Sequence, residues 1–351
     1  MSDAEGTVYH LALRGHHAAN GATFRTRGGW SMPEQYGAAA AEYSALRERV
    51  ALIDRSSRSR FIVSGTDAAV VLERTFQGHV TELEEGRAMR TVALDTRGRI
   101  RDLALIARTG GIAYLVTGEP RQRWETLERL TAALDADFDC RIDDRTESTC
   151  AIELAGPAAE AAARGNLGEG LPPGLPIMHC AAFEFHGFRS LAVRSSDSGE
   201  DGFLFMFAPA VAQHVMETLV GAGVRLCGQA AAECARVEAC IPAFEPDLEP
   251  GLTPAEADLD VLLGIEGGDH GRILSALLLE EPAIAPAGSA ITSGGEVIGD
   301  VRSCVRSFGL RATIALGIID ARAALPGREC EIAGARAAVV AKPFLRRRSQ
   351  S

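Results

Sequence analysis

The clearest alternation of apolar and polar residues lies between residues 91 and 106, and it predicts two strands joined by a tight turn. Residues 91–94 form a short apolar run. Residues 95–98 (DTRG) have the composition of a turn whose glycine takes a positive φ. Beyond Arg101 both faces of the second strand are apolar, so we expect this strand to be covered on both sides.

Asp102 is the anomaly in this second strand. Strands disfavour aspartate, and a buried carboxylate needs either a hydrogen-bonding partner or a shifted pKa. One interpretation is a structural residue bonded to backbone amides or to an arginine. The other is a catalytic acid or base. The residues alone leave both open.

Similar patterns predict the rest of the first 240 residues. Period-3.6 patterns indicate helices over 8–24, 38–50, 66–76, 119–134, 211–222 and 230–239. Short apolar runs indicate strands over 52–55, 60–65, 112–117 and 203–207, and a hairpin over 182–193. Residues 28–36 predict a Gly- and Pro-rich loop, whose Trp30 and Tyr36 either line a pocket or form a hydrophobic plug.

The pattern changes near residue 282. Short strands without intervening helices are predicted over 291–299, 304–308, 312–318, 329–332 and 338–341, which is typical of a small β-barrel or sandwich. We therefore expect an α+β fold. Residues 1–278 would form two α+β lobes, and residues 282–347 a C-terminal β domain.

Composition narrows the class of protein. The chain has 351 residues and a formal net charge of −11, which argues against a nucleic-acid partner. It has no run of eighteen apolar residues and an acidic N-terminus, so we expect no membrane span, no signal peptide and a cytoplasmic location. Its eight cysteines form no CxxC pair, which favours buried thiols over a metal site. Lys342 is its one lysine and precedes a proline, which disfavours Schiff-base chemistry.

Several short motifs resemble one known family and occur in that family's order. They are residues 29–36 (GWSMPEQY), 46–54 (LR and LID), 86–103 (GRA and GRIRDL), 154–157 (LAGP), 199–203 (GEDGF), 236–257 (RVEACIP and LTPAEA) and 295–344 (GEVIGDV and KPF). Together they resemble the aminomethyltransferase, or T protein, of the glycine cleavage system and its folate-dependent relatives. Each motif is weak alone, but seven in order cover nearly the whole chain.

The resemblance implies a fold and a chemistry. The family fold is a three-lobed ring with tetrahydrofolate in a central channel and a C-terminal β-barrel. Asp102 matches the family's catalytic aspartate, which would orient the pterin, stabilise developing positive charge and relay a proton. Arg236 matches an arginine that pairs with the acidic tail of folate. Trp30, from the first motif, would line the same channel.

Three positions depart from the family pattern. Arg90 stands where the family has a tyrosine before the hairpin. Leu204 replaces a carboxylate that accepts hydrogen bonds from the amino-pyrimidine edge of the pterin. Gln77 lies in a segment that has lost the family's asparagine. Losing one such charge-assisted hydrogen bond costs roughly 1.5–3 kcal/mol, so folate would not bind by its usual contacts.

Three functional hypotheses follow. The first is tetrahydrofolate-dependent aminomethyl or methyl transfer to or from a small molecule, with Asp102 as acid/base. The second is a folate-independent enzyme of specialised metabolism that keeps the same channel. The third is a non-catalytic folate-binding protein for iron–sulfur assembly, although residues 267–273 lack the cysteine motif of that group. The glycine cleavage role also needs a lipoyl carrier protein, for which the sequence has no recognisable docking signature.

Overall fold

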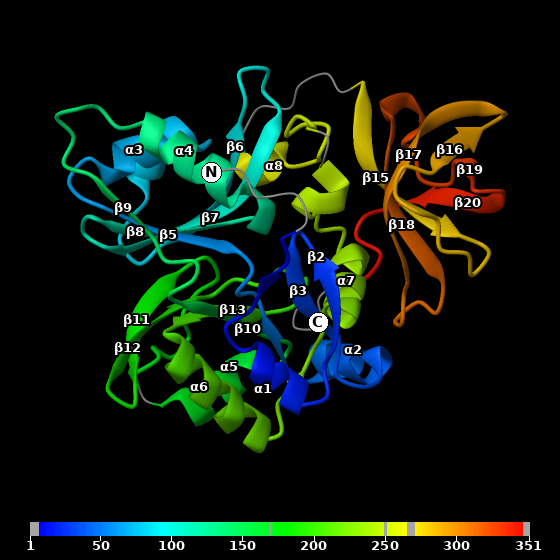
Figure 1. Cartoon of the computed structure of the whole chain (residues 1–351). Helices are drawn as coiled ribbons and strands as arrows, with labels where there is room; N and C mark the ends of the chain where they lie inside the picture. The colour runs from blue at the N-terminus through cyan, green and yellow to red at the C-terminus, as the bar shows by residue number, and fades with distance from the viewer. Residues whose placement is uncertain (1–6, 169, 249–250, 265–270, 347–351) are drawn as a thin grey trace. The chain divides into compact units, whose positions relative to one another are not determined.

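The computed structural model describes residues 7–168, 170–248, 251–264 and 271–346, except for the side chains of residues 261 and 262 (Figure 1). The chain divides into two compact units. Unit 1 comprises Met1–Leu94, Arg101–Ser196 and Glu200–Ala231, and unit 2 comprises Asp95–Ile100, Asp197–Gly199 and Ala232–Ser351.

Unit 1 begins with a small sheet where the sequence predicts a helix and a loop. Its strands are β1 (Tyr9–His10), β2 (Thr23–Arg27) and β3 (Trp30–Gln35), in the order β1-β3-β2, and α1 spans only Arg14–Ala19. The helix expected over 8–24 and the loop expected over 28–36 are therefore wrong. Pro33 and two glycines suggested a loop, but the pairing of β2 with β3 shifts by one residue next to Pro33, and proline is tolerated at such an irregularity.

The second sheet of unit 1 has six strands, in the order β11-β12-β13-β10-β4-β14. The strands are β4 (Ala51–Asp54), β10 (Cys150–Ala155), β11 (Cys180–Phe185), β12 (Phe188–Val193), β13 (Gly202–Phe207) and β14 (Arg225–Leu226). The helices of this region are α2 (Ala39–Glu48), α5 (Ala159–Leu167) and α6 (Pro209–Gly221), and α7 (Gln229–Glu238) follows β14. The strands predicted over 52–55 and 203–207 and the hairpin over 182–193 are confirmed; α5 is an element that the sequence pattern missed.

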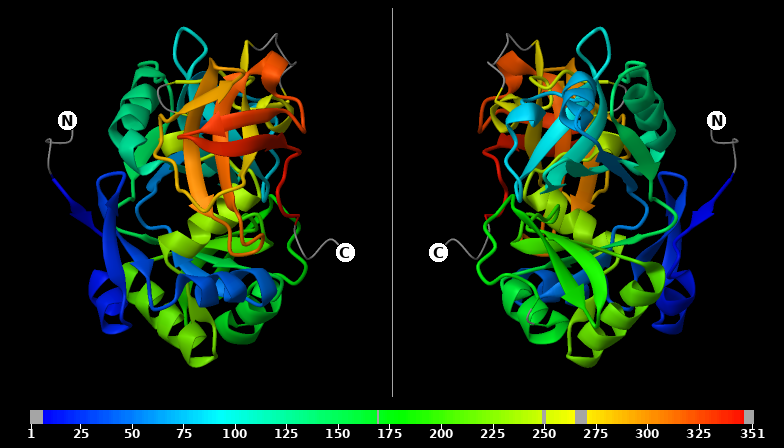
Figure 2. Two further views of the ribbon diagram at one scale, coloured as in Figure 1. Left: turned by 90° about the vertical axis from the view of Figure 1, so that its right-hand side faces the viewer. Right: turned by 90° about the vertical axis from the view of Figure 1, so that its left-hand side faces the viewer.

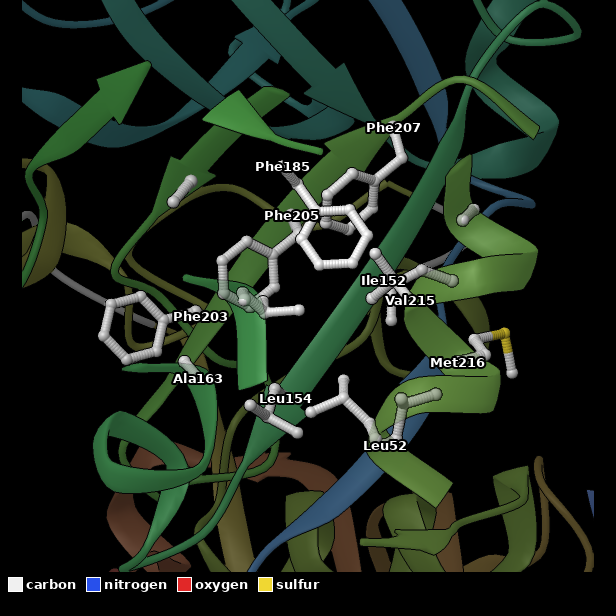
Figure 3. Close-up of a cluster of buried hydrophobic side chains, with 14 of the residues drawn as sticks. Leu52, Ile152, Leu154, Ala163, Phe185, Phe203, Phe205, Phe207, Val215 and Met216 are labelled. Atoms are coloured by element: carbon white, nitrogen blue, oxygen red, sulfur yellow. The ribbon is translucent and has the colours of Figure 1, made fainter. Parts of the chain in front are cut away.

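One face of this sheet packs on helices. Phe203, Phe205 and Phe207 alternate along β13 and stack on one another, with adjacent ring centroids 5.7 Å apart. Figure 3 shows them in one buried cluster with Val215 and Met216 of α6. The intervening residues of β13 therefore point to the opposite face of the sheet.

The third sheet of unit 1 has five strands, in the order β6-β7-β8-β5-β9. Its strands are β5 (Ser59–Ser64), β6 (Ala88–Leu94), β7 (Ile100–Gly110), β8 (Ala113–Gly118) and β9 (Arg141–Asp144), and α3 (Ala68–Thr75) and α4 (Arg123–Ala132) accompany them. The predicted hairpin strands over 91–106 are confirmed. As expected, this sheet has apolar clusters on both faces, one including Ala104 and Ile106, and the other Leu105 and Ala107.

Unit 2 contains a closed β-barrel, which confirms the predicted β-rich C-terminal part. Its order is β15-β18-β17-β16-β19-β20, and Figure 2 shows its strands in yellow to red. The bounds are β15 (Arg272–Leu279), β16 (Ala290–Ser293), β17 (Glu296–Arg306), β18 (Thr313–Asp320), β19 (Glu329–Ile332) and β20 (Ala335–Val340), and α8 (Asp260–Leu263) precedes them. The expected boundary between residues 278 and 282 falls at the end of β15, the first strand of the barrel, and not before it. The division into two domains stays a prediction. Within the described residues, no helix is long and apolar enough to span a membrane.

A set of polar side chains, of which His17 and Asp54 are buried and Tyr36 half-buried, holds the N-terminal part of unit 1 together. His17 Nε2 lies 2.7 Å from Asp54 Oδ2, and the hydroxyl of Tyr36 lies 2.7 Å from His17 Nδ1. The amide of Ser56 donates to Asp54 Oδ1 at 2.7 Å. Burial alone would raise the pKa of Asp54, but the hydrogen bonds from His17 and Ser56 outweigh it and hold that pKa below its usual range. These hydrogen bonds thus join α1, the end of β3 and the end of β4.

We expect Tyr36→Phe to lower the free energy of unfolding by about 1 kcal/mol, because one buried hydrogen bond to His17 is lost. Thermal melting measures this loss. Tyr114→Phe is the matched control, since the Tyr114 hydroxyl makes no hydrogen bond among the described residues. Equal melting temperatures for the two variants would show that these polar side chains contribute nothing measurable.

Candidate functional site

Asp102 is held in a closed environment in unit 1. It lies on β7 and is 1% exposed. The hydroxyl of Thr126, on α4, donates to its Oδ2 at 2.6 Å, and the backbone amide of Glu119 donates to its Oδ1 at 2.9 Å. Gly118 makes room for the carboxylate, since a Cβ at that position would lie 2.4 Å from Oδ2. Both oxygens therefore have a donor.

The pKa of Asp102 is shifted towards neutrality. Burial raises it to about 7, against the two hydrogen bonds, which lower it. The negative charge of Glu119 raises it further, and the guanidinium of Arg58 lowers it. A carboxyl group with this pKa exchanges protons near neutral pH, which suits an acid/base residue.

Asp102 and the apolar cluster around Leu204 use opposite faces of the five-stranded sheet. Along β7, Asp102 shares its face with Ala104 and Ile106, which belong to the cluster beneath the helices. Leu105 points the other way, into a cluster that includes Leu204 of β13. The expectation that Asp102 and Leu204 line one channel stays a prediction, and strand alternation argues against it.

Arg90, Gln77 and Leu204 are each placed by contacts that involve β6 or its neighbours. Ala88, on the same face of β6 as Arg90, belongs to the cluster of Leu204. Arg90 donates through Nη2 to Ser195 Oγ at 2.8 Å and to the carbonyl of Ser196 at 3.1 Å. The backbone amide of Gln77 donates to the carbonyl of Val92 at 2.9 Å.

Glu153 is a charged residue in this region that the sequence analysis missed. It lies in β10, a strand whose six residues are all buried, and it is directly opposite Leu204 in the strand register. Arg55 Nε donates to its Oε2 at 2.6 Å, and Ser196 Oγ donates to its Oε1 at 2.5 Å. The available signal was a glutamate inside an otherwise apolar run, the same anomaly that singled out Asp102.

Arg236 lies in unit 2, where its five N–H groups all have acceptors. These are both carboxylate oxygens of Glu233, Asp247 Oδ2 at 2.6 Å, Ser303 Oγ at 2.8 Å and the carbonyl of Ile241. The carboxylates of Asp247 and Glu233 raise its pKa despite burial. Binding a folate tail would require one of these acceptors to be displaced, so that role stays a prediction.

Trp30 is part of a small apolar plug. It is 7% exposed and packs with Leu11 and Met32, and its ring centroid lies 5.2 Å from that of Tyr9. This segment was expected either to line a pocket or to form a hydrophobic plug, and the contacts of Trp30 are those of a plug. Elsewhere in the described residues, no three His, Cys, Asp or Glu side chains meet as metal ligands.

Family models match both parts of the chain. The GCVT N-terminal domain model matches residues 13–266, and the glycine cleavage T-protein C-terminal barrel domain model matches residues 272–345. The chain belongs to the glycine cleavage T-protein family. The second match begins at the first residue of β15, the first strand of the barrel.

Relatives in this family are named aminomethyltransferases, so the family is one of group-transfer enzymes. The chain is 30% identical to the aminomethyltransferase of Streptomyces avermitilis, over 96% of this chain and 98% of the relative. It is 29% identical to that of Streptomyces coelicolor, over 99% and 100%. The crystal structure of the glycine cleavage system aminomethyltransferase T of Bartonella henselae has the same fold, with a TM-score of 0.89 at 22% identity, over 97% and 99% of the two chains.

Within this family fold, Gly118 tests how closely Asp102 is confined. We expect Gly118→Ala to lower the free energy of unfolding by about 1–3 kcal/mol, because the new methyl group would press on Oδ2 and on Ser59 Oγ, 3.0 Å away. Gly110→Ala is the control, since its Cβ meets only Ala113 Cβ at 3.8 Å. Thermal melting compares them, and an unchanged Gly118→Ala protein would mean that Asp102 moves freely.

Proposed function

We propose that the protein is a one-carbon group transferase of the aminomethyltransferase type that acts on a small molecule. The observation that supports this most is coverage, because the family match runs along nearly the whole chain and includes the barrel. We propose a cytoplasmic location for it. A lipoyl carrier protein is a possible partner, but no feature of the described residues supports it.

Tetrahydrofolate is the one-carbon carrier that we propose, but the residues here do not fit its usual contacts. Leu204 lies in an apolar cluster and has no acceptor to offer. Arg236 has all its donors engaged within unit 2. Folate would therefore have to be bound through other groups, among which Arg90 and Gln77 are our candidates.

Asp102 is our candidate acid/base residue, on the strength of its pKa of about 7. Thr126 donates to Oδ2 when the carboxylate is ionised. Protonation at Oδ2 would reverse this bond, because a hydroxyl both donates and accepts. Asp102 therefore keeps a partner in both protonation states. The competing interpretation is structural, and its support is that both oxygens already have donors.

Asp102→Asn separates the two roles. If Asp102 is the acid/base, turnover with tetrahydrofolate and a one-carbon donor should fall by a factor of ~10² or more. The protein should stay folded, because the amide oxygen can accept from Glu119 and the amide nitrogen can donate to Thr126. A clear drop in melting temperature with turnover nearly intact would make Asp102 structural.

The raised pKa also predicts a pH dependence of stability. Between about pH 4 and pH 7 the folded protein keeps a proton on Asp102 that the unfolded chain has lost. This contribution to the free energy of unfolding therefore falls as pH rises towards 7 and is constant above it. Melting of the wild type minus that of Asp102→Asn should show this slope, and a flat difference would contradict the shift.

A second function is favoured by the residues around Leu204. With Leu204 in place of a carboxylate and Arg90 in place of a tyrosine, the region offers a cation and apolar area in place of acceptors. A folate-independent enzyme would then take a ligand with a carboxylate or enolate near Arg90.

Arg90→Tyr, which restores the family residue, tests this second function. We expect it to weaken binding of an acid-bearing ligand by roughly tenfold or more, the scale of one charge-assisted hydrogen bond. Binding titrations measure this change. Micromolar tetrahydrofolate binding that Arg90→Tyr leaves undisturbed would instead restore the plain family role. A non-catalytic folate-binding role stays the third hypothesis; residues 265–270 of its motif region lie outside the described residues.

A further inference from the structure

Two histidines from different elements of unit 1 lie against each other on its surface. His186 lies in the turn between β11 and β12, and His214 lies on α6. Both residues are exposed. Their ring centroids are 5.2 Å apart, and their planes make an angle of 86°. We call these two residues the histidine pair.

Phe185 supports both rings of the histidine pair. Its ring centroid lies 4.4 Å from that of His186 and 5.6 Å from that of His214. Phe185 is 2% exposed and belongs, with Val215 of α6, to the buried cluster of Figure 3. Because buried clusters are closely packed, Phe185 cannot easily move. The fold therefore holds the two histidines side by side.

The turn at His186 gives no reason for a histidine. Phe185 pairs with Phe188, so His186 and Gly187 form a two-residue hairpin turn, and their φ angles are both positive, at 50° and 80°. Turns of this kind favour asparagine, aspartate or glycine at the first position. Asparagine at position 186 would therefore keep the hairpin and remove the imidazole.

The ring nitrogens of the histidine pair are available to a ligand. Within the part of the chain that the structure describes, no protein group forms a hydrogen bond or an ion pair with either imidazole. A neutral imidazole has one nitrogen that can accept, and χ2 of histidine turns over a broad range at little cost. Because both rings are exposed, an ion can reach these nitrogens directly from solvent.

We propose that the histidine pair binds one divalent transition-metal ion of the class that favours imidazole, namely Ni²⁺, Cu²⁺ or Zn²⁺. Metal–nitrogen distances of about 2.0–2.1 Å and a tetrahedral angle place the centroids of two ligating imidazoles roughly 5 Å apart, which matches the separation of this pair. Among the described residues no third His, Cys, Asp or Glu joins the pair, so water would complete the coordination.

A metal ion at this position would connect two elements of unit 1. It would join the β11–β12 hairpin to α6 at the surface, next to the apolar contacts that already hold them together. The inference is independent of the function proposed above, because neither Asp102 nor tetrahydrofolate enters it. Failure of the metal site would therefore leave the proposed function untouched, and the reverse is also true.

Isothermal titration of the full chain, without a histidine tag, tests the site with Ni²⁺ as the probe. Ni²⁺ is chosen because imidazole suits it, whereas Zn²⁺ also takes cysteine thiolates. We expect saturable binding of one ion per chain. His186→Asn and His214→Gln should each weaken this binding by roughly tenfold or more, since the second ligand of a pair acts at a high effective concentration.

His10→Asn is the matched control, because it removes an exposed histidine from another element, β1. Its affinity for Ni²⁺ should equal that of the wild type. The site is overturned if the wild type shows no saturable binding up to about 1 mM. It is also overturned if either His186→Asn or His214→Gln binds as tightly as the wild type, because the ion would then not be held by both rings.

Thermal melting gives a second measurement of the same site. Saturating Ni²⁺ should raise the melting temperature of the wild type and of His10→Asn, because an ion that binds only the folded chain stabilises it. It should leave His186→Asn unchanged, although that variant should fold as well as the wild type does, since asparagine suits its turn. Mg²⁺, which prefers oxygen ligands, should have no such effect on any of them. An equal rise with Ni²⁺ in the wild type and in His186→Asn would contradict the proposal.

Discussion

The main physical constraint on unit 1 is that every charged side chain it buries must have partners. Its strands bring Asp54, Asp102 and Glu153 into the interior, each 3% exposed or less. An unpaired buried carboxylate would cost several kcal/mol, a large part of the stability of a domain. Each of the three is therefore tied to residues from other elements. His17 and Ser56 bind Asp54, Thr126 and Glu119 bind Asp102, and Arg55 and Ser196 bind Glu153. These partners tie the buried carboxylates to the elements around them.

The buried carboxyl group of Asp102 and the guanidinium of Arg90 lie on different faces of the five-stranded sheet. Asp102 faces the helices, where burial brings its pKa to about 7. On the opposite face of the five-stranded sheet, Leu105 packs in the apolar cluster that includes Leu204, whose partner in the strand register of the six-stranded sheet is Glu153. Arg90 of β6 donates to the 195–196 segment. An acid near neutrality and a cation are both useful to a transferase. The two roles that we propose, ligand choice at Arg90 and proton transfer at Asp102, would thus belong to different parts of unit 1.

The sequence predicted elements best where the periodicity was strong. The strands around 91–106 and 203–207 and the barrel were found because short apolar runs bounded by turn residues marked them. The first 36 residues failed because β1, β2 and α1 are too short to show a period, and because Pro33 resembled a loop signal. The site was harder. Asp102 was found as a misplaced charge, but its partners come from α4 and the residues before it, and tertiary contacts of that kind leave no local pattern. The partners that saturate Arg236 lie up to 67 residues away.

The central claim is that the protein uses tetrahydrofolate as its one-carbon carrier. Isothermal titration of the wild-type protein with tetrahydrofolate tests it most directly, because the measurement does not require the one-carbon donor or acceptor to be known. The account predicts saturable binding of one tetrahydrofolate per chain, with a dissociation constant in roughly the micromolar range. Absence of saturable binding up to about 1 mM by a protein that melts cooperatively would contradict it. The family fold would then serve a folate-independent reaction.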